Sequence, residues 1–365
     1  MIKVPLFPSK RIALYTAKLF LLRSLAVLAA LVVILQTLDL LGESGKILRY
    51  PGNGDAHLWQ YVSLRLPQLV ARFLPFAVLL GTLITLAGLN QNSEVIAMKA
   101  AGISAHQIIA PLIVASLFIA GLTYIFQERI VTRATATLRA WEVVEYGPLP
   151  KETELLNNVW VRQGDDLIFA AAVTGRGEAA RLRGVKVYER SGGTLRATVT
   201  AEAGERSGDG WLLRNAERFD IADTTLTKLP TLLVGRGVDP TQFTLARVDP
   251  AEQDLATLRD SIEQMRVAGR PTSALEAGLW HKLSGPLSAL LMPLLAAVAA
   301  FGLARSGQLF LRAVLGMALG FAYFVADNFA LAMGNLGAYP PLLAAWAPFF
   351  LFLLIGETVL VRTEE

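Results

Sequence analysis

The sequence contains no cysteine, which excludes disulfide bonds and thiolate metal sites. Its three histidines are scattered and form no H-E-x-x-H zinc motif. A phosphate-binding loop is also missing, because "GESGK" is followed by Ile47 and has the wrong spacing. No G-x-S-x-G nucleophile elbow occurs. We therefore expect no catalytic residue, no metal site and no cofactor in this chain.

Charged residues are scarce, at 18% of the chain against about 25% in soluble domains, while hydrophobic residues make up 53%. The chain contains six apolar runs of about the 20 residues that a membrane span needs, at 19–41, 66–89, 108–126, 281–303, 309–334 and 340–360. The first run follows a basic start but is too long for a signal core, so we expect a retained anchor. The net charge of +4 is explained by basic residues beside spans, and we expect no nucleic-acid partner.

Basic residues in short loops orient the predicted spans. If six spans alternate, the bases of one side are Lys3, Lys10, Arg11, Lys18, Arg23, Lys99, Arg305, Arg312 and Arg362. On the other side, the loop at 336–339 has none, and the first loop has Lys46, Arg49 and Arg65 beside Glu43 and Asp55. We therefore expect both termini in the cytoplasm and the long polar insert between spans three and four outside it.

The polar insert is predicted to be an all-β domain. The segment "NNVWVRQGDDLIFAAAV" alternates around a Gly-Asp-Asp turn, and "RGVKVYERSGGTLRATVTAEAG" repeats the pattern around Ser-Gly-Gly. Further strands are expected in "DGWLLRNAERFDI" and "KLPTLLVGRGV". Short strands separated by frequent turns favour an antiparallel sandwich or jelly roll.

A helix is predicted at the end of the insert, at about 250–268. Its apolar residues recur at helical spacing and share one face: Leu255, Leu258, Ile262 and Met265. Asp249 is the expected cap and Gly269 the expected stop. Two roles are open, a packed connector or a moving element that couples the insert to the spans.

A short polar helix is predicted at about 92–104, in "NQNSEVIAMKAAGIS" between spans two and three. Ser93 is the expected cap, which places Glu94 near the positive end of the helix dipole. Val95 and Met98 are expected in a small apolar surface, and Gly102 ends the helix. From the residues alone, this helix either docks on a cytoplasmic partner, with Glu94 paired to an arginine there, or lies on the headgroups.

The stretch "NSEVIAMKAAGIS" resembles the signature that follows the second span in the lipopolysaccharide-export permeases of the LptF/LptG family. The order of three spans, a β insert and three spans matches that family over nearly the whole chain. Four segments favour the LptG branch over the paralogous LptF branch, which stays open as an alternative: "LPQLVARFLPFAVLLGTLITLAGLNQNSE", "NNVWVRQGDDLIF", "FAYFVADNFALAMGNLG" and "YPPLLAAWAPFFLFLLIG".

The resemblance implies an α-helical integral membrane protein with six transmembrane helices and an inserted periplasmic, jelly-roll-like all-β domain. The expected domains are 1–127 with the coupling helix, 128–279, and 280–365. The implied function is that of a non-catalytic permease subunit in the bacterial inner membrane, which extracts lipopolysaccharide and passes it to a periplasmic bridge. The implied partners are an LptF-like permease, an LptB-like ATPase dimer that holds ATP and Mg²⁺, and an LptC-like bridge protein. In the family the acid of the coupling helix contacts the ATPase, and Glu94 matches that acid.

The substrate that the resemblance implies has acyl chains and phosphates, so we expect cations near the outer ends of the spans. Arginine suits phosphate because its guanidinium forms two parallel hydrogen bonds. Taken singly, such residues more often anchor a span to headgroups. The candidates are Arg65, Arg72, Arg133, Arg139, His281 and Lys282, with Asp39 beside them.

Two unrelated functions compete with export. The first is an ion-coupled transporter that uses Asp327, an acid within span five. Asp327 can instead form an interhelical hydrogen bond that holds the spans together, which would remove the argument for ion coupling.

The second is a permease whose outer domain transmits motion. Such proteins usually carry that domain between their first two spans, unlike this chain.

Overall fold

The computed structural model describes residues 9–148, 156–175, 180–238, 249–267, 270–302 and 309–364. The chain divides into two compact units. The helical unit comprises residues 1–147, 250–262 and 271–365, and the β unit comprises 148–249 and 263–270. The helical unit therefore extends past residue 127, where the sequence alone suggests that the insert begins.

Six helices in the described residues are long and apolar enough to cross a membrane, as the sequence predicts. They are α1 (Lys10–Arg49), α2 (Asp55–Gln91), α4 (Ala105–Phe126), α8 (Ser273–Ala297), α9 (Leu309–Asn335) and α10 (Pro341–Glu364). The π-helical turn η1 (Gln127–Val131) continues α4 into α5 (Thr132–Val143), and a second such turn, η4 (Val298–Gly302), follows α8.

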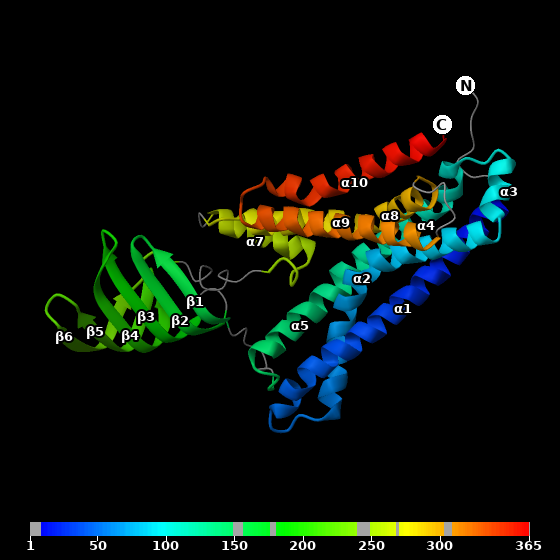
Figure 1. Ribbon diagram of the computed structural model, residues 1–365. Helices are drawn as coiled ribbons and strands as arrows, with labels where there is room; N and C mark the ends of the chain where they lie inside the picture. Colours follow the sequence, from blue (N-terminus) through cyan, green and yellow to red (C-terminus); the bar gives the residue numbers. More distant parts are fainter. Residues whose placement is uncertain are drawn as a thin grey trace. The chain divides into compact units, whose positions relative to one another are not determined.

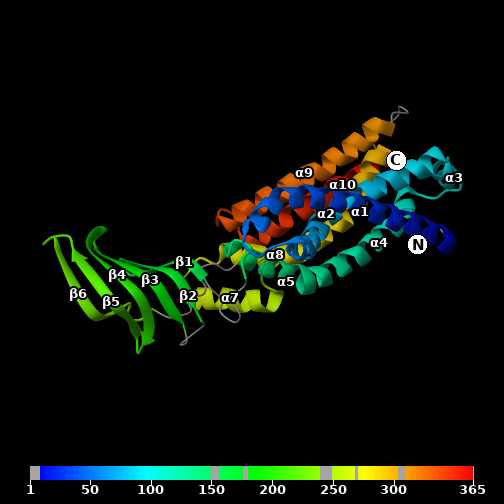
Figure 2. The same ribbon diagram turned by 90° about the horizontal axis from the view of Figure 1, so that it is seen from below.

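The main core of the helical unit lies along α8, which is the most buried of the spanning helices and packs against α2, α4, α9 and α10. The start of α1 and the end of α10 lie at the end that carries the short helix α3 (Glu94–Ala100) (Figures 1 and 2). We call this the α3 end, and the opposite end of the unit the α5 end.

A second, aromatic core holds the α5 end together. Trp141 and Tyr146 meet edge to face with ring centroids 5.2 Å apart, beside the buried side chains of Ile47 and Tyr61. The Tyr146 hydroxyl donates a 2.9 Å hydrogen bond to Glu43 of α1. Burial raises the pKa of Tyr146, and the bond to Glu43 raises it further, so the phenol stays protonated. These contacts fix the ends of α1, α2 and α5 to one another.

The β unit is one antiparallel sheet in its described part, with each strand beside its sequence neighbour. Its strands are β1 (Leu156–Gln163), β2 (Asp166–Thr174), β3 (Arg181–Ser191), β4 (Thr194–Ser207), β5 (Gly210–Asp220) and β6 (Thr225–Val234). The predicted Gly-Asp-Asp and Ser-Gly-Gly turns join β1 to β2 and β3 to β4. Gly192 and Gly193 both have positive φ, as a tight hairpin requires. The predicted fold class, a helical membrane protein with an inserted β domain, is confirmed.

One face of the sheet, which we call the inner face, is apolar and buried: Val159, Val161, Ile168, Ala170, Val173, Leu182, Val185, Val187, Val199, Ala201, Trp211, Leu213 and Ala216. Along strands β2 to β5, buried and exposed residues alternate, but at one point in each strand the alternation skips a residue. These points lie next to one another in neighbouring strands and form a line across the sheet. On β3, Leu182 and Val185 are both buried although they lie three residues apart. Gly184, with φ of +59°, lies on this line, and its missing Cβ would approach Ala171 to 2.8 Å. The line is therefore a bend built into the strands.

The connecting helix α7 (Leu255–Val267) presents the apolar face that its spacing predicts, with Leu258, Ile262 and Met265 buried. Its cap is Asp254 and not Asp249, because the Asp254 carboxylate accepts the Thr257 N–H at 2.9 Å. Hydrogen bonds from Thr257 lower the pKa of Asp254 below its ordinary 3.8. The cap therefore stabilises α7 at pH values above 3.8, and this stabilisation is lost as the pH falls through the lowered pKa of Asp254. Gly269, the predicted stop, lies outside the described residues.

Candidate functional site

The short helix α3 is tied to the bundle by its own apolar residues. Val95 and Met98 are buried in the main core, so they anchor the helix instead of offering an exposed docking surface. Ile96 points the other way and is 61% exposed. Gly102 has φ of +80° and closes the turn after the helix, as predicted. The surface that α3 presents is therefore narrower than the sequence suggests.

Ser93 does not cap α3 with its side chain, contrary to the sequence-based expectation. It adopts a left-handed conformation with φ of 59°, and its hydroxyl makes no capping bond. Glu94 lies at the first position of the helix and is partly exposed. Its Oε1 accepts a 3.3 Å hydrogen bond from the Tyr15 hydroxyl of α1. The carboxylate is thus held at the positive end of α3 by a residue of another spanning helix.

Two predicted lipid contacts, Arg65 and Asp39, pair with each other near the α5 end. The Arg65 guanidinium forms a two-pronged ion pair with Asp39, with Nε 3.1 Å and Nη2 3.0 Å from the carboxylate oxygens. Tyr61 donates a 2.6 Å hydrogen bond to Asp39, and Gln68 accepts one of 2.8 Å from Arg65. This network joins α1 to α2. The Arg65 guanidinium already donates hydrogen bonds to Asp39 and Gln68 within the protein.

His281 and Lys282 are likewise paired within the helical unit. His281 Nε2 lies 3.0 Å from Asp327 Oδ2, which joins α8 to α9 and supports the interhelical interpretation of Asp327. The Lys282 ammonium lies 3.0 Å from Glu128 Oε1 of η1, and only 5% of the lysine side chain is exposed. Lys282 is therefore buried in an ion pair and is not a surface cation.

The remaining predicted cations, Arg72, Arg133 and Arg139, are exposed. Arg139 lies 4.0 Å from Glu252, at the limit of an ion pair, and 60% of its side chain is exposed. Arg133 is on the same helix, α5, while Arg72 is on α2. The arrangement leaves guanidinium groups on α5 that can bind a phosphate by charge-assisted hydrogen bonds.

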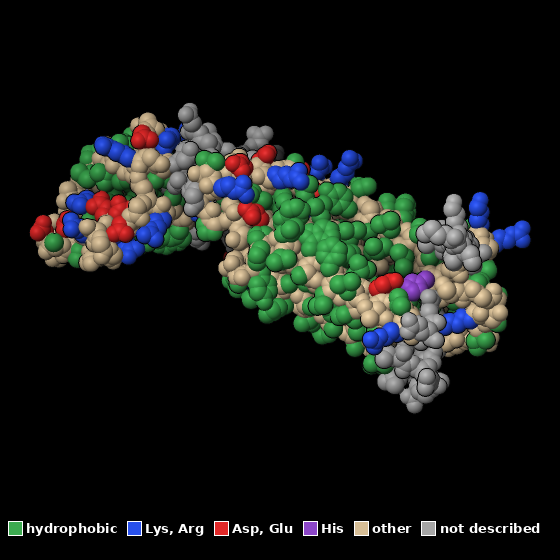
Figure 3. Space-filling view, turned by 90° about the horizontal axis from the view of Figure 1, so that it is seen from above, with side chains coloured by type: hydrophobic (Ala, Val, Ile, Leu, Met, Phe, Trp, Pro, Cys, Tyr) green, Lys and Arg blue, Asp and Glu red, His purple; other side chains and the backbone are tan. Residues whose placement is uncertain are grey.

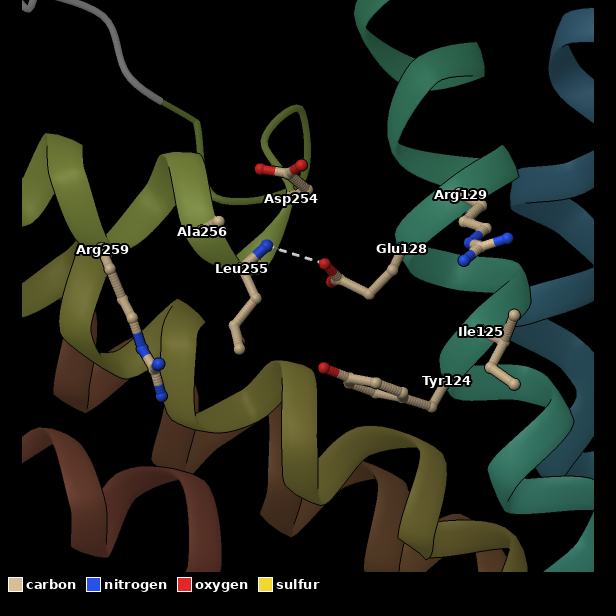
Figure 4. Close-up of a pocket in the computed structure, with 8 residues that line it drawn as sticks. All are labelled: Tyr124, Ile125, Glu128, Arg129, Asp254, Leu255, Ala256 and Arg259. Carbon is tan, nitrogen blue, oxygen red and sulfur yellow. Dashed lines mark hydrogen bonds between the residues drawn. The ribbon is translucent and has the colours of Figure 1, made fainter.

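Glu128 was not among the residues predicted from the sequence, yet it lines a pocket of about 510 Å³ between the α4–η1 segment and the start of α7 (Figure 4). Tyr124 and Leu255 project into it, and Glu128 points from η1 toward α7, where it accepts the Leu255 N–H at 2.7 Å. No sequence motif marks this contact, because its partners are 127 residues apart.

The surface chemistry of the helical unit is that of a protein in lipid. In the face seen from above α10, apolar side chains cover the middle of the unit (Figure 3). Many of the exposed large side chains lie on spanning helices, for example Leu25, Leu117 and Leu354. Among the described residues, no three His, Asp or Glu side chains come together as a metal site would need.

The fold and these sites define a multi-pass membrane protein with a β domain inserted between its third and fourth spanning helices. The family model for the lipopolysaccharide export system permeases LptF/LptG matches residues 14–362, and the chain belongs to that family.

Two curated relatives extend the match to nearly full length. The permease protein LptG of Escherichia coli is 25% identical over 348 residues, which cover 93% of this chain and 94% of the relative. LptG of Haemophilus influenzae is 25% identical over 334 residues, covering 87% and 90% of the two chains. Both relatives are named as permease proteins of the lipopolysaccharide export system.

Proposed function

We propose that this chain is the LptG-type permease subunit of an ATP-driven lipopolysaccharide exporter in the bacterial inner membrane. The observation that carries the proposal is the family match over residues 14–362, together with the six spans and the β insert that it implies. The family also includes LptF, and the LptG assignment rests on the two named relatives. The basic residues near the α3 end favour a cytoplasmic location for that end.

The proposed complex contains a second, LptF-like permease, a dimer of LptB-like ATPase chains and an LptC-like bridge protein. ATP and Mg²⁺ are bound by the ATPase chains, since this sequence has no phosphate loop. The α3 helix is the proposed contact with the ATPase. Its carboxylate, Glu94, is pre-positioned by Tyr15 and partly exposed, which suits pairing with an arginine of the partner.

Lipid binding is assigned to the α5 end, the periplasmic end in this orientation. The exposed guanidinium groups of Arg133 and Arg139 would bind phosphates, and Arg72 would add a further cation on α2. Arg65, paired with Asp39, would shape the site without touching the lipid, whereas Lys282 is buried in its pair with Glu128 and is left out of the proposed lipid site. When the ATPase closes, its push on α3 would narrow the space between the two permeases and expel the lipid.

The inner face of the β unit is the proposed receiver of the acyl chains. Each CH₂ group carried through water instead would cost about 0.8 kcal/mol, so a continuous apolar path is needed. The inner-face side chains are buried in this state. Acyl chains could reach them only when the sheet opens, and the bend through Gly184 is a natural place for that movement.

The direct test of the proposed function is purification of the chain from native bacterial membranes without crosslinking. We expect an ATPase and a second permease of the same architecture to co-purify, and ATP to drive release of bound lipopolysaccharide. A chain that purifies alone and moves its substrate with an ion gradient in the absence of ATP would overturn the proposal.

The Arg139→Glu variant is expected to lower photocrosslinking of lipopolysaccharide to the helical unit, because a carboxylate repels the lipid phosphates. The charge reversal should leave assembly with the other chains intact, since Arg139 is exposed. Arg214→Glu is the matched control: side-chain exposure is 59% for Arg214 and 60% for Arg139, and each lies beside one glutamate. Equal crosslinking in the two variants would reduce Arg139 to a headgroup anchor.

A further inference from the structure

Both oxygens of the Glu128 carboxylate are used, and they serve two different helices. Oε1 accepts from the Lys282 ammonium of α8 at 3.0 Å, and Oε2 accepts from the backbone N–H of Leu255 at 2.7 Å. Leu255 is the first residue of α7. One side chain of the third spanning helix therefore joins the fourth spanning helix to the helix that leads the chain back from the insert. Figure 4 shows the second of these links, from Glu128 to Leu255.

The burial of the ion pair shows that it is more than a surface contact. The side chains of Lys282 and Glu128 are 5% and 15% exposed. Burying two charges is costly, and well-packed apolar residues usually stabilise a protein as well or better. Stability alone therefore poorly explains a buried pair at this position. Because Glu128 contacts both α8 and α7, a role in holding these helices together explains it better.

The backbone around Glu128 is also unusual. Glu128 lies in η1, the π-helical turn that interrupts the α4–α5 helix, and Thr132 donates a 2.8 Å side-chain hydrogen bond to the Gln127 carbonyl there. Such turns inside α-helices often occur at functional sites. In η1 the turn carries the residue whose side chain reaches α7.

Two carboxylates serve the start of α7. Asp254 caps it from within, through the Thr257 N–H. Glu128 accepts a different N–H of the first turn, that of Leu255, and so ties α7 to a spanning helix. Residues 255–262 of α7 belong to the helical unit and residues 263–267 to the β unit. The chain therefore passes from one unit to the other within α7, and the hydrogen bond to Glu128 fixes the first residue of this helix.

We propose that Glu128 is a positioning residue for lipid transfer: it ties the start of α7 to the third and fourth spanning helices, so that their movement is passed to the insert. This inference rests on the proposed export function. The tie explains why a glutamate with two acceptor oxygens is placed at the π-helical turn. It also converts Lys282 from a predicted lipid contact into the partner that holds Glu128 in place.

Two double variants separate the tie from the ion pair. Glu128→Lys with Lys282→Glu keeps a buried ion pair but leaves the Leu255 N–H without its acceptor. Glu128→Gln with Lys282→Met removes both charges together and keeps an amide oxygen that can accept from Leu255. We expect only the first double variant to lose the tie, which hydrogen exchange at the first amides of α7 measures directly.

Lipid transfer is measured in the full complex in proteoliposomes, with a photocrosslinking residue at Leu66 of α2 or at Leu229 beside the inner face of the β unit. In the charge-swapped variant, we expect crosslinking at Leu229 to fall by about tenfold, as the loss of one charge-assisted hydrogen bond would give. Crosslinking at Leu66 and ATP hydrolysis should remain at the wild-type level. The Glu128→Gln, Lys282→Met variant should transfer lipid like the wild type.

Asp254→Ala is the control for simple weakening of α7, because it removes the cap and leaves the Glu128 bond. Full transfer in this variant supports the positioning role, whereas a loss equal to that of the charge swap would overturn it. Wild-type transfer in the charge swap would also overturn it. If the wild-type complex itself gave no ATP-dependent crosslink at either position, the export function would fail instead, and the two failures are therefore distinguishable.

Discussion

The Gly81→Ala variant is expected to lose the close packing of α1 against α2 and to unfold well below the wild-type temperature. A methyl group at Gly81 would come within 2.6 Å of the Ser24 Cα and 2.8 Å of its backbone nitrogen, and it would also collide with the Ser24 hydroxyl. These are backbone atoms, so the helices themselves must separate. Overpacking of this kind typically costs about 1–3 kcal/mol.

Gly121→Ala provides the matched control, because Gly121 also lies in a spanning helix, α4, but has no atom within 4 Å of the added methyl group. Alanine is intrinsically better than glycine in a helix by about 1 kcal/mol, so this variant should unfold at or above the wild-type temperature. Thermal unfolding of the purified protein in detergent measures both. Equal unfolding temperatures for the two variants would show that the α1–α2 contact adapts without cost.

The Gly81 contact reflects how the bundle is held together in lipid. Association of spanning helices gains little from the hydrophobic effect there, so close backbone approach through small residues takes its place. Gly320 and Gly356 also make room for a neighbouring helix, but there the near atoms belong to the side chains of Leu79 and Leu294 and not to the backbone. The sequence locates these glycines in apolar runs but does not say which helix each one faces.

The spans and hairpins could be predicted because their signals are local. Apolar length determines a span, and the Ser-Gly-Gly turn between alternating residues determines a hairpin. The bend across the β sheet could not be predicted in the same way. It depends on Gly184 of β3 and on a matching shift of burial in the neighbouring strands, which only the paired sheet reveals.

The candidate site was predictable in composition but not in pairing. Arg65, His281 and Lys282 were identified as cations near the ends of spans, and each is found beside a carboxylate of another helix. Sequence distance hides such partners, since Glu128 and Lys282 are 154 residues apart. Their pairing leaves the exposed arginines of α5 as the stronger candidates for phosphate contact.

The α3 helix shows the same limit on a smaller scale. Its position and its acid were predicted, but Ser93 adopts a left-handed conformation and does not cap with its side chain. Tyr15 of α1 holds Glu94 instead. A movement of α3 would therefore be passed to α1 directly, as well as to the core through Val95 and Met98.

The Glu94→Ala variant is expected to lose most of its bound ATPase, or to hydrolyse ATP without releasing lipid. Removing one member of a charge pair that is desolvated at an interface typically costs about 2 kcal/mol or more. The variant chain should still fold, because Glu94 is partly exposed and the side-chain hydrogen bonds that it accepts, from Tyr15 at 3.3 Å and from Asn92 at 3.5 Å, are long. Co-purification of the ATPase and ATP-dependent lipid release measure the two outcomes separately.

Glu357→Ala is the control for a general loss of negative charge at the α3 end. Glu357 is an exposed carboxylate of α10, 3.0 Å from His106 at the start of α4. Its loss should leave ATPase binding unchanged, while Tyr15→Phe, which removes the shorter of two hydrogen bonds to Glu94, should bind an amount of ATPase between those of the wild type and Glu94→Ala. If Glu94→Ala retained the ATPase and released lipid at the wild-type rate, α3 would be a loop helix on the headgroups, and the force that drives export would have to enter the bundle elsewhere.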